Sequence, residues 1–293
     1  MRVLWLSLIW LLQACSTSHP NIADTRLNSP QLSILAIGDS LTNGGKNNNY
    51  REPLAELTKL TVLNYGVGGQ RSDHISARLG LRAIDVSAKA GFFIEGRNEL
   101  SRIFPPPITS QGAKQITCQT LTHIQCEIQL VEKTYFLTLT ESVNTQNLQL
   151  RTPLIDTTNS IGIIWVGRNN AAQTERVLSD IELIVNQFKH HQSSYLILTV
   201  LNGQGEGVNT GIHTKILELN RRLIATYGQQ VLDIRQVLVD SYRQDDAVDI
   251  NNYQQDIVPQ SLRKDGLHLN AQGNQIVAQA IYNKLTALKL IQH

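Results

Sequence analysis

Ile34-Leu35-Ala36-Ile37-Gly38-Asp39-Ser40-Leu41-Thr42-Asn43-Gly44 is the stretch on which the interpretation of the whole chain depends. Its uncharged apolar run ends abruptly in a polar loop, which is typical of a buried strand in a parallel sheet. Ser40 would then lie just past the carboxyl end of that strand, where open α/β sheets bind their ligands. Asp39 and Ser40 are also helix-capping residue types, so an ordinary strand–loop–helix junction explains this motif equally well when it is taken alone.

The far end of the chain supplies groups that would make Ser40 reactive. A serine hydroxyl is a weak nucleophile unless a base removes its proton and a third group orients that base. Asp265 and His268 lie three residues apart, and on a tight turn or one helical turn this spacing puts both side chains on the same side. Ser40, His268 and Asp265 are therefore a candidate catalytic triad.

Four segments resemble, in the right order, the four sequence blocks of the SGNH (GDSL-type) hydrolases. They are Gly38-Asp39-Ser40-Leu41-Thr42, Asn64-Tyr65-Gly66-Val67-Gly68-Gly69, Gly167-Arg168-Asn169-Asn170 and Asp265-Gly266-Leu267-His268. Each block alone is weak, but together they frame nearly the whole chain from about residue 32. The resemblance implies a three-layer α/β/α sandwich with a parallel sheet, the flavodoxin-like fold of this family. It also implies ester hydrolysis through an acyl-serine, with no metal and no organic cofactor.

The resemblance also implies a role for particular residues. Ser40 would be the nucleophile, His268 the base and Asp265 the partner of that base. The backbone amides of Ser40 and Gly69, with the side-chain amide of Asn169, would form the oxyanion hole. As an isolated residue, Asn169 would be read as a helix cap; the presence of Ser40 and His268 favours the catalytic role.

The chain departs from the family pattern in two places. Asn170 stands where many members carry Asp; it is not a triad member, so we expect Asn170 and Asp39 only to support the site. Residues 81–156 form a long segment that members often lack. Proline-rich residues 104–107 cannot continue a regular element, and alternating runs such as 134–140 predict antiparallel strands. We expect an inserted small β-rich subdomain, which either walls one side of the crevice or simply packs on the core.

Residues 1–15 are predicted to be a secretory signal peptide. A single positive residue, Arg2, precedes an apolar stretch at 3–12 that is too short to span a bilayer comfortably. Ala14 before Cys15 resembles a bacterial lipobox, which implies that Cys15 is lipidated. Ordinary signal cleavage and an uncleaved anchor are the alternatives.

The residues after Cys15 predict where the protein resides. Ser16, not Asp, follows the cysteine, which resembles sorting to the outer membrane of a Gram-negative cell. Residues 16–30 are polar and read as a tether, which leaves 31–293 as the hydrolase domain. We therefore expect an exported cell-envelope lipoprotein held to the membrane by N-terminal acyl chains.

Cys118 and Cys126 would meet an oxidising compartment after export. A hairpin turning near Thr122 would place them opposite each other, so we predict a disulfide; two buried free thiols are the alternative. Their spacing, with only His123 between them, does not suit zinc ligation, and we expect no metal site.

Composition sets the remaining limits. The formal charge of +2 gives no case for nucleic acid as a partner, and 41% apolar with 17% charged residues describes a globular protein.

Strands alternate with helices, which supports a doubly wound parallel sheet. Beyond the first strand and outside the insert, we expect strands at 61–64, 161–167, 195–201 and 231–234 and helices at 50–59, 174–189, 214–227 and 271–288.

The function predicted from the sequence is an exported serine esterase acting on carboxylic esters. We favour a short acyl group, acetyl, on a saccharide or cell-envelope glycan, because no long apolar stretch outside residues 1–15 would suit an acyl-chain tunnel. The alternatives are a lipase, lysophospholipase or thioesterase of the same family, an O-acyltransferase, and a non-catalytic glycan-binding surface lipoprotein.

Overall fold

A computed structural model describes residues 31–291. The predicted signal peptide at 1–15, the lipidation site Cys15 and the tether at 16–30 lie outside the described residues. Within the described residues, no helix is both long enough and apolar enough to cross a lipid bilayer.

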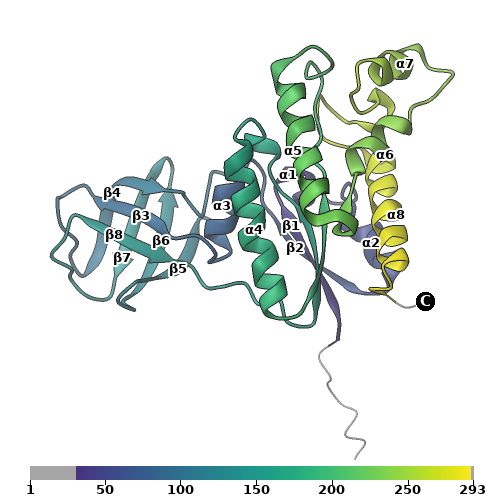
Figure 1. Ribbon diagram of the computed structural model, residues 1–293. Helices are drawn as coiled ribbons and strands as arrows, with labels where there is room; N and C mark the ends of the chain where they lie inside the picture. The colour runs from purple at the N-terminus through teal and green to yellow at the C-terminus, as the bar shows by residue number, and fades with distance from the viewer. Residues whose placement is uncertain (1–30, 292–293) are drawn as a thin grey trace, which may run out of the picture. The chain divides into compact units, whose positions relative to one another are not determined.

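The centre of the fold is a five-stranded sheet with the strand order β11-β10-β9-β1-β2 (Figure 1). All neighbouring strands are parallel, and Gly38 at the end of β1 pairs with Gly66 of β2 and Trp165 of β9. This order is that of flavodoxin-like sheets, with the topological switch point beside β1. The strands are β1 (Ser33–Gly38), β2 (Thr61–Gly66), β9 (Ser160–Trp165), β10 (Ser194–Leu198) and β11 (Val231–Leu232).

Helices cover both faces of this sheet. Ile34 and Ala36 of β1 belong to one hydrophobic core and the alternate residues Leu35 and Ile37 to the other. Burial on both faces explains why the strand is apolar throughout. The predicted three-layer α/β/α sandwich is therefore confirmed. The first face is covered by α2 (Arg51–Thr58), α6 (Ile234–Asp240) and α8 (Ala271–Ala287), the second by α3 (Ser72–Arg78), α4 (Thr174–His190) and α5 (Gly211–Tyr227).

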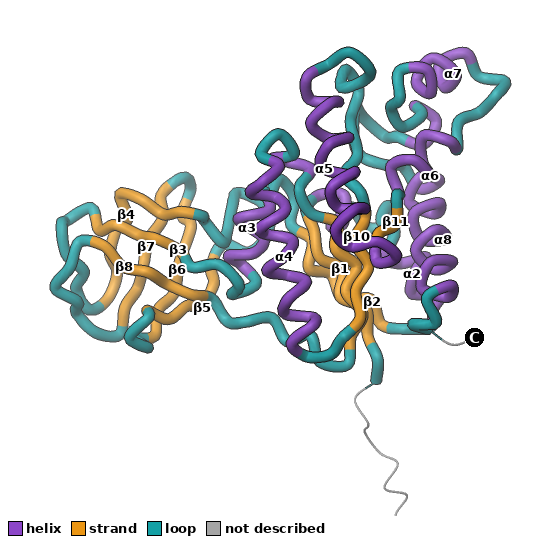
Figure 2. Tube along the Cα trace, in the orientation of Figure 1, coloured by secondary structure: helices purple, strands orange, loops and turns teal. Residues whose placement is uncertain are grey.

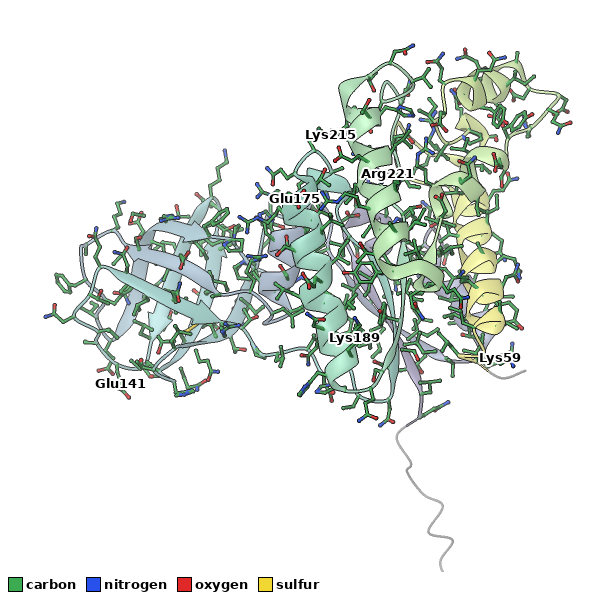
Figure 3. The ribbon with its side chains drawn as sticks, viewed as in Figure 1. Lys59, Glu141, Glu175, Lys189, Lys215 and Arg221 are labelled. Atoms are coloured by element: carbon green, nitrogen blue, oxygen red, sulfur yellow. A yellow bond between two sulfur atoms is a disulfide. The ribbon has the colours of Figure 1, made fainter. Side chains whose placement is uncertain are left out.

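The charges at the two ends of α4 suit the helix dipole. Glu175 lies in its first turn and Lys189 in its last, and Figure 3 labels both side chains. A negative charge near the amino end and a positive charge near the carboxyl end each stabilise a helix by a few tenths of a kcal/mol to about 1 kcal/mol. Glu175 also forms an ion pair with Arg222 of α5, so the two helices are joined at this end.

The segment between α3 and β9 folds as a closed antiparallel barrel with the order β3-β4-β7-β6-β5-β8 (Figure 2). Its apolar residues form a third core, distinct from the two cores of the sheet. The predicted inserted β-rich subdomain is thus confirmed as part of the fold. Its strands are β3 (Ile84–Ala88), β4 (Gly96–Phe104), β5 (Gln115–Thr120), β6 (Gln125–Val131), β7 (Thr134–Leu139) and β8 (Asn147–Arg151).

Cys118 of β5 and Cys126 of β6 lie directly opposite each other in the ladder and are joined by a disulfide, with their Cα atoms 4.8 Å apart. Both side chains belong to the barrel core. The bond therefore links two neighbouring strands of the inserted barrel, and it does not join the barrel to the sheet.

Three expected strands end earlier than predicted, and the strand expected at 161–167 ends at Trp165. The strand expected at 195–201 ends at Leu198, and the one expected at 231–234 ends at Leu232. The last of these differences arises because Asp233 caps α6, its Oδ1 accepting the Gln236 N–H. Similarly, α5 begins at Gly211, before the expected position, because the hydroxyl of Thr210 caps it.

The sequence analysis missed several short elements. In α3 the buried residues include Ser72, Asp73 and Ser76, so the helix has no clean apolar stripe to predict it. In α7 (Ala247–Gln254) only two polar side chains are buried. The other short elements that were not expected are α1 (Ser40–Asn43), α6 (Ile234–Asp240) and the 3₁₀ turns Arg168–Asn170, Gly228–Gln230 and Gln260–Leu262.

Candidate active site

Ser40 lies at the amino end of α1, directly after the switch-point strand β1. Asp39 caps this short helix, its Oδ1 accepting the Leu41 N–H at 3.0 Å. The turn requires glycine at position 38, because a Cβ there would lie 2.2 Å from the Thr42 Oγ1 and 2.5 Å from the Trp165 carbonyl oxygen. The backbone therefore turns sharply enough to present Ser40 at the carboxyl edge of the sheet.

His268 and Asp265 lie together on a tight turn before α8. The Asp265 Oδ1 accepts the backbone N–H of Leu267 at 2.8 Å and of His268 at 2.7 Å. The His268 Nδ1 lies 2.9 Å from the Asp265 Oδ2, and the His268 Nε2 lies 2.9 Å from the Ser40 Oγ. The Asp265 carboxylate can only accept, so Nδ1 carries the proton and Nε2 is free to accept one from Ser40. The structure thus brings together three residues from opposite ends of the chain.

The environment of Asp265 favours its ionised form. Partial burial would raise the pKa of this carboxyl, but the two backbone N–H groups and the His268 ring lower it to about 2. Its side chain is 47% exposed and that of His268 is 34% exposed, so solvent reaches both groups. At neutral pH Asp265 is therefore a carboxylate, which holds the imidazole in the orientation that Ser40 needs.

Gly69 and Asn169 come from the loops after β2 and β9, the two strands that flank β1. Gly69 adopts φ +71°, a conformation that favours glycine. Within residues 31–291, the backbone N–H groups of Ser40 and Gly69 have no hydrogen-bond acceptor. The Asn169 Nδ2 donates to the Gln70 carbonyl oxygen at 2.9 Å, which orients its amide and leaves the second amide hydrogen for another acceptor.

A buried network, which we call the α3–α4 clamp, joins Ser72, Asn170 and Asp180. The Asn170 Oδ1 accepts the Ser72 N–H at 3.1 Å, and the Asn170 Nδ2 donates to the Ser72 Oγ at 2.9 Å. That hydroxyl in turn donates to the Asp180 Oδ2 at 2.6 Å. Arg82 neutralises Asp180, with its Nε 2.8 Å from Oδ1. The clamp therefore fastens the loop that carries Gly69 to the turn that carries Asn169.

Asp39 is wholly buried beneath Ser40. Burial raises the pKa of Asp39 to about 6, against the opposing effects of the Leu41 N–H and the charges of Arg168 and His268. Arg168 is held by Glu206, with its Nη2 2.9 Å from Oε1 and 2.8 Å from Oε2. Asp39 thus supports the turn beneath Ser40 with a carboxyl group that changes charge near neutral pH.

The loop after β10 packs against the turn that carries Asp265 and His268. The Gln204 N–H donates to the Gly266 carbonyl oxygen at 2.7 Å, and Glu206 accepts the Gly203 N–H at 2.7 Å. Through Glu206 the same loop is joined to Arg168. This loop therefore links the turn that carries His268 to the turn that carries Asn169.

Sequence reasoning missed three residues that shape the site: Gln70, Ser72 and Asp180. Asp180 did leave a signal, because it lies on the apolar face of the predicted helix at 174–189, between Val177 and Ile181. A charged residue at such a position is buried and needs partners. Gln70 and Ser72 left no comparable signal, since polar residues are ordinary in a glycine-rich loop.

The described residues hold no cluster of three or more His, Cys, Asp or Glu side chains arranged to bind a metal ion. The atoms gathered around Ser40 are instead a hydroxyl, an imidazole, a carboxylate and amide N–H groups. This set can transfer an acyl group, with a nucleophile, a base and donors for a developing negative charge.

Comparison with known proteins places these features in a family. The profile of the GDSL-like Lipase/Acylhydrolase family matches residues 34–281. Among solved structures, a member of the lipolytic protein G-D-S-L family from Veillonella parvula DSM 2008 is similar, with 12% identity, a TM-score of 0.49, and 87% of this chain and 98% of that chain covered. Axe2, an acetylxylan esterase from Geobacillus stearothermophilus, is also similar. Its identity to this chain is 12% and its TM-score is 0.49, with 87% of this chain and 94% of that chain covered. No curated protein matches the chain.

Proposed function

Because the chain belongs to the GDSL-like lipase/acylhydrolase family, we propose that it is a serine esterase that removes short acyl groups, acetyl above all, from a saccharide or cell-envelope glycan. Membership of the family makes the chain an ester hydrolase. The observation that supports the serine mechanism is the continuous hydrogen-bonded chain from Ser40 through His268 to Asp265.

In the proposed reaction the Ser40 Oγ attacks the ester carbonyl carbon while the His268 Nε2 takes the hydroxyl proton. The ionised Asp265 stabilises the imidazolium that forms. The carbonyl oxygen becomes an oxyanion, which accepts hydrogen bonds from the Ser40 and Gly69 N–H groups and the Asn169 side chain. His268 then protonates the leaving alcohol, which departs and leaves the acyl-serine. A water molecule attacks the acyl carbonyl carbon while His268 takes its proton, the bond to the Ser40 Oγ breaks, and His268 returns the proton to that oxygen as the carboxylic acid leaves.

The free N–H groups support this assignment of the oxyanion hole. The Ser40 and Gly69 amides have no acceptor within residues 31–291, and Asn169 uses its contact with Gln70 for orientation. Gly68 brings the loop close to the nucleophile, since a Cβ on Gly68 would lie 3.9 Å from the Ser40 Cβ. Donors that are already oriented need no rearrangement when charge develops.

The short acyl group is supported by the surroundings of Ser40. Among the described residues, the hollow that includes Ser40 and His268 is small, and its wall combines polar residues such as Asn48 and Lys264 with Leu41 and Leu269. A long acyl chain would require an extended apolar channel instead. The saccharide part of the proposal rests on the predicted envelope location, which the residues before 31 suggest through the signal peptide, Cys15 and the tether.

The first experiment measures acetate release from p-nitrophenyl acetate by the purified full-length protein in detergent. We expect turnover in the wild type and only background in Ser40→Ala. Asn169→Ala should lower kcat by about 10²–10³-fold because one oxyanion donor is lost. The control is Asn283→Ala, an exposed residue of α8. A folded wild-type protein that releases no acetate would contradict the proposal and favour an acyltransferase or a glycan-binding protein.

A further inference from the structure

The connection between β4 and β5 leaves the barrel and lies against the loop that carries Gly69. The Gln70 Nε2 donates to the Pro107 carbonyl oxygen at 3.0 Å, and Gln70 is wholly buried. At Gly112 a Cβ would lie 3.0 Å from the Val67 Cγ1. Residues 105–114, which we call the wall segment, are therefore packed on the site loop at two separated points.

The wall segment is also fastened to the barrel and to the oxyanion region. The Tyr135 hydroxyl of β7 donates to the Ile108 carbonyl oxygen at 2.8 Å. Gln70, which binds Pro107 through its side-chain nitrogen, accepts the Arg78 Nε–H through its side-chain oxygen at 2.9 Å and the Asn169 amide through its backbone oxygen. One buried glutamine thus sets the position of the wall segment relative to Asn169.

Gln111 of the wall segment and Ser40 both lie within 4 Å of the position that a Cβ on Gly68 would take. A Cβ on Gly68 would lie 3.5 Å from the Gln111 Cγ and 3.9 Å from the Ser40 Cβ. The two side chains therefore flank the same glycine, and glycine adds no bulk between them. Gln111 is exposed, and its side-chain amide has no hydrogen-bond partner among residues 31–291.

The chemistry of this amide matches a sugar better than an alkyl chain. A glutamine side chain offers two N–H donors and one carbonyl acceptor, and a sugar hydroxyl can both donate and accept. Next to the nucleophile, such a group would meet the alcohol portion of an ester. Because Gln111 is exposed, water pairs with its amide when the substrate lacks the matching hydroxyl, so we expect the discrimination to be moderate.

We propose that the inserted barrel supplies a wall of the ester site, and that Gln111 is a specificity-determining residue that hydrogen-bonds hydroxyl groups of a saccharide leaving group. This inference rests on the proposed esterase function and deepens it. It assigns the insert a role in substrate selection, and it does not involve Gln111 in the chemical step.

The test compares two esters with the full-length protein. One is p-nitrophenyl acetate, whose leaving group has no sugar hydroxyls; the other is a mono-O-acetylated methyl glucoside with its remaining hydroxyls free. We expect Gln111→Ala to lower kcat/KM for the glucoside about tenfold, mainly through KM, and to leave p-nitrophenyl acetate within twofold. The control variant is Gln146→Ala. Gln146 is exposed, and its backbone carbonyl oxygen accepts the Ala88 N–H. This contact lies at the end of β3 and β8 that is opposite to Ile84 and Arg151.

Each other outcome overturns the inference in a recognisable way. Equal effects of Gln111→Ala on both esters, or no effect on either, would show that Gln111 does not select the leaving group. Wild-type turnover of p-nitrophenyl acetate without turnover of the glucoside would reject the saccharide but keep the esterase. A folded wild type that hydrolyses neither ester would reject the proposed function itself.

Discussion

Asp39 is a residue whose position in the fold changes its chemistry. In the sequence Asp39 is a helix-capping residue type. In the structure it is wholly buried, and burial raises its pKa to about 6. In the unfolded chain the pKa of this carboxyl would be ~3.9. The folded protein therefore holds a proton on Asp39 over a pH range in which the unfolded chain does not.

This difference predicts a pH-dependent contribution to stability. Because the folded-state pKa is raised, the contribution is fully present below pH ~4 and is lost as the pH rises through about 6. Asp39→Asn should remove it, so the unfolding free energy of the wild type relative to this variant should fall by roughly 2–3 kcal/mol between pH 4 and pH 7. Urea unfolding of both proteins across this range is the measurement. A difference that stays constant with pH would show that Asp39 keeps an ordinary pKa.

At the scale of elements, the α3–α4 clamp joins the two loops that carry the proposed oxyanion donors. Gly69 and Asn169 belong to separate loops. The hydrogen bonds among Ser72, Asn170 and Asp180 fix the position of one loop relative to the other. Asn170 suits this chain because it must donate to the Ser72 hydroxyl, whose own proton goes to Asp180. A carboxylate at position 170 could only accept.

Asn170→Asp is therefore expected to weaken the site even though many relatives in the family pattern carry Asp there. The new carboxylate would compete with Asp180 for the Ser72 hydroxyl and add a second buried negative charge. We expect kcat for p-nitrophenyl acetate to fall at least tenfold with KM within threefold. The double variant Asn170→Asp/Asp180→Asn should recover part of this loss, because one carboxylate and one amide are restored.

A purely structural role for the clamp would give a different result. It would lower the melting temperature of Asn170→Asp without changing kcat of the folded fraction, and the double variant would then recover stability only. Unchanged kcat in the single variant at a temperature where it is fully folded would contradict the positioning role.

At the scale of the whole molecule, the described residues 31–291 contain three hydrophobic cores, and the third is formed mainly by the barrel, with Ala77 of α3 and Ile108 of the wall segment. The barrel begins and ends beside α3: the Leu81 N–H binds the Ser76 carbonyl oxygen, and the Thr152 hydroxyl donates to the Ala77 carbonyl oxygen at 2.7 Å. Since α3 follows directly on the Gly69 loop, the barrel is attached where it can act on the site.

Removing the disulfide tests whether the barrel unfolds independently of the sheet. Replacing Cys118 and Cys126 by Ala removes a cross-link that closes a short loop, for which chain entropy gives roughly 2–3 kcal/mol. Because both sulfurs lie in the barrel core, amide hydrogen exchange should quicken in β5 and β6 and stay unchanged in β1 and β9. Hydrolysis of p-nitrophenyl acetate should remain within twofold. Equal acceleration in the sheet strands would mean that barrel and sheet unfold as one unit.

The sequence by itself determined the features that depend on local pattern and residue chemistry. The uncharged run before Gly38 predicted a strand buried on both faces, the alternation of strands and helices predicted the layered sheet, and the ordered blocks around Ser40, Asn169 and His268 identified the family. These features can be read locally because burial sets the polarity of a strand, and because a reaction type requires particular functional groups.

The sequence predicted that Ser40 and His268 meet, but only the tertiary structure decided their geometry and which other distant groups lie together. Ser40 and His268 are 228 residues apart in the chain, and the 2.9 Å between their side chains depends on the placement of β1 and the turn before α8. The α3–α4 clamp and the approach of Gln111 to Gly68 likewise depend on how separate elements pack. Periodicity reports which face of an element is buried, but it carries no information about which polar groups from other elements lie against that face, and this information arises only when the chain folds.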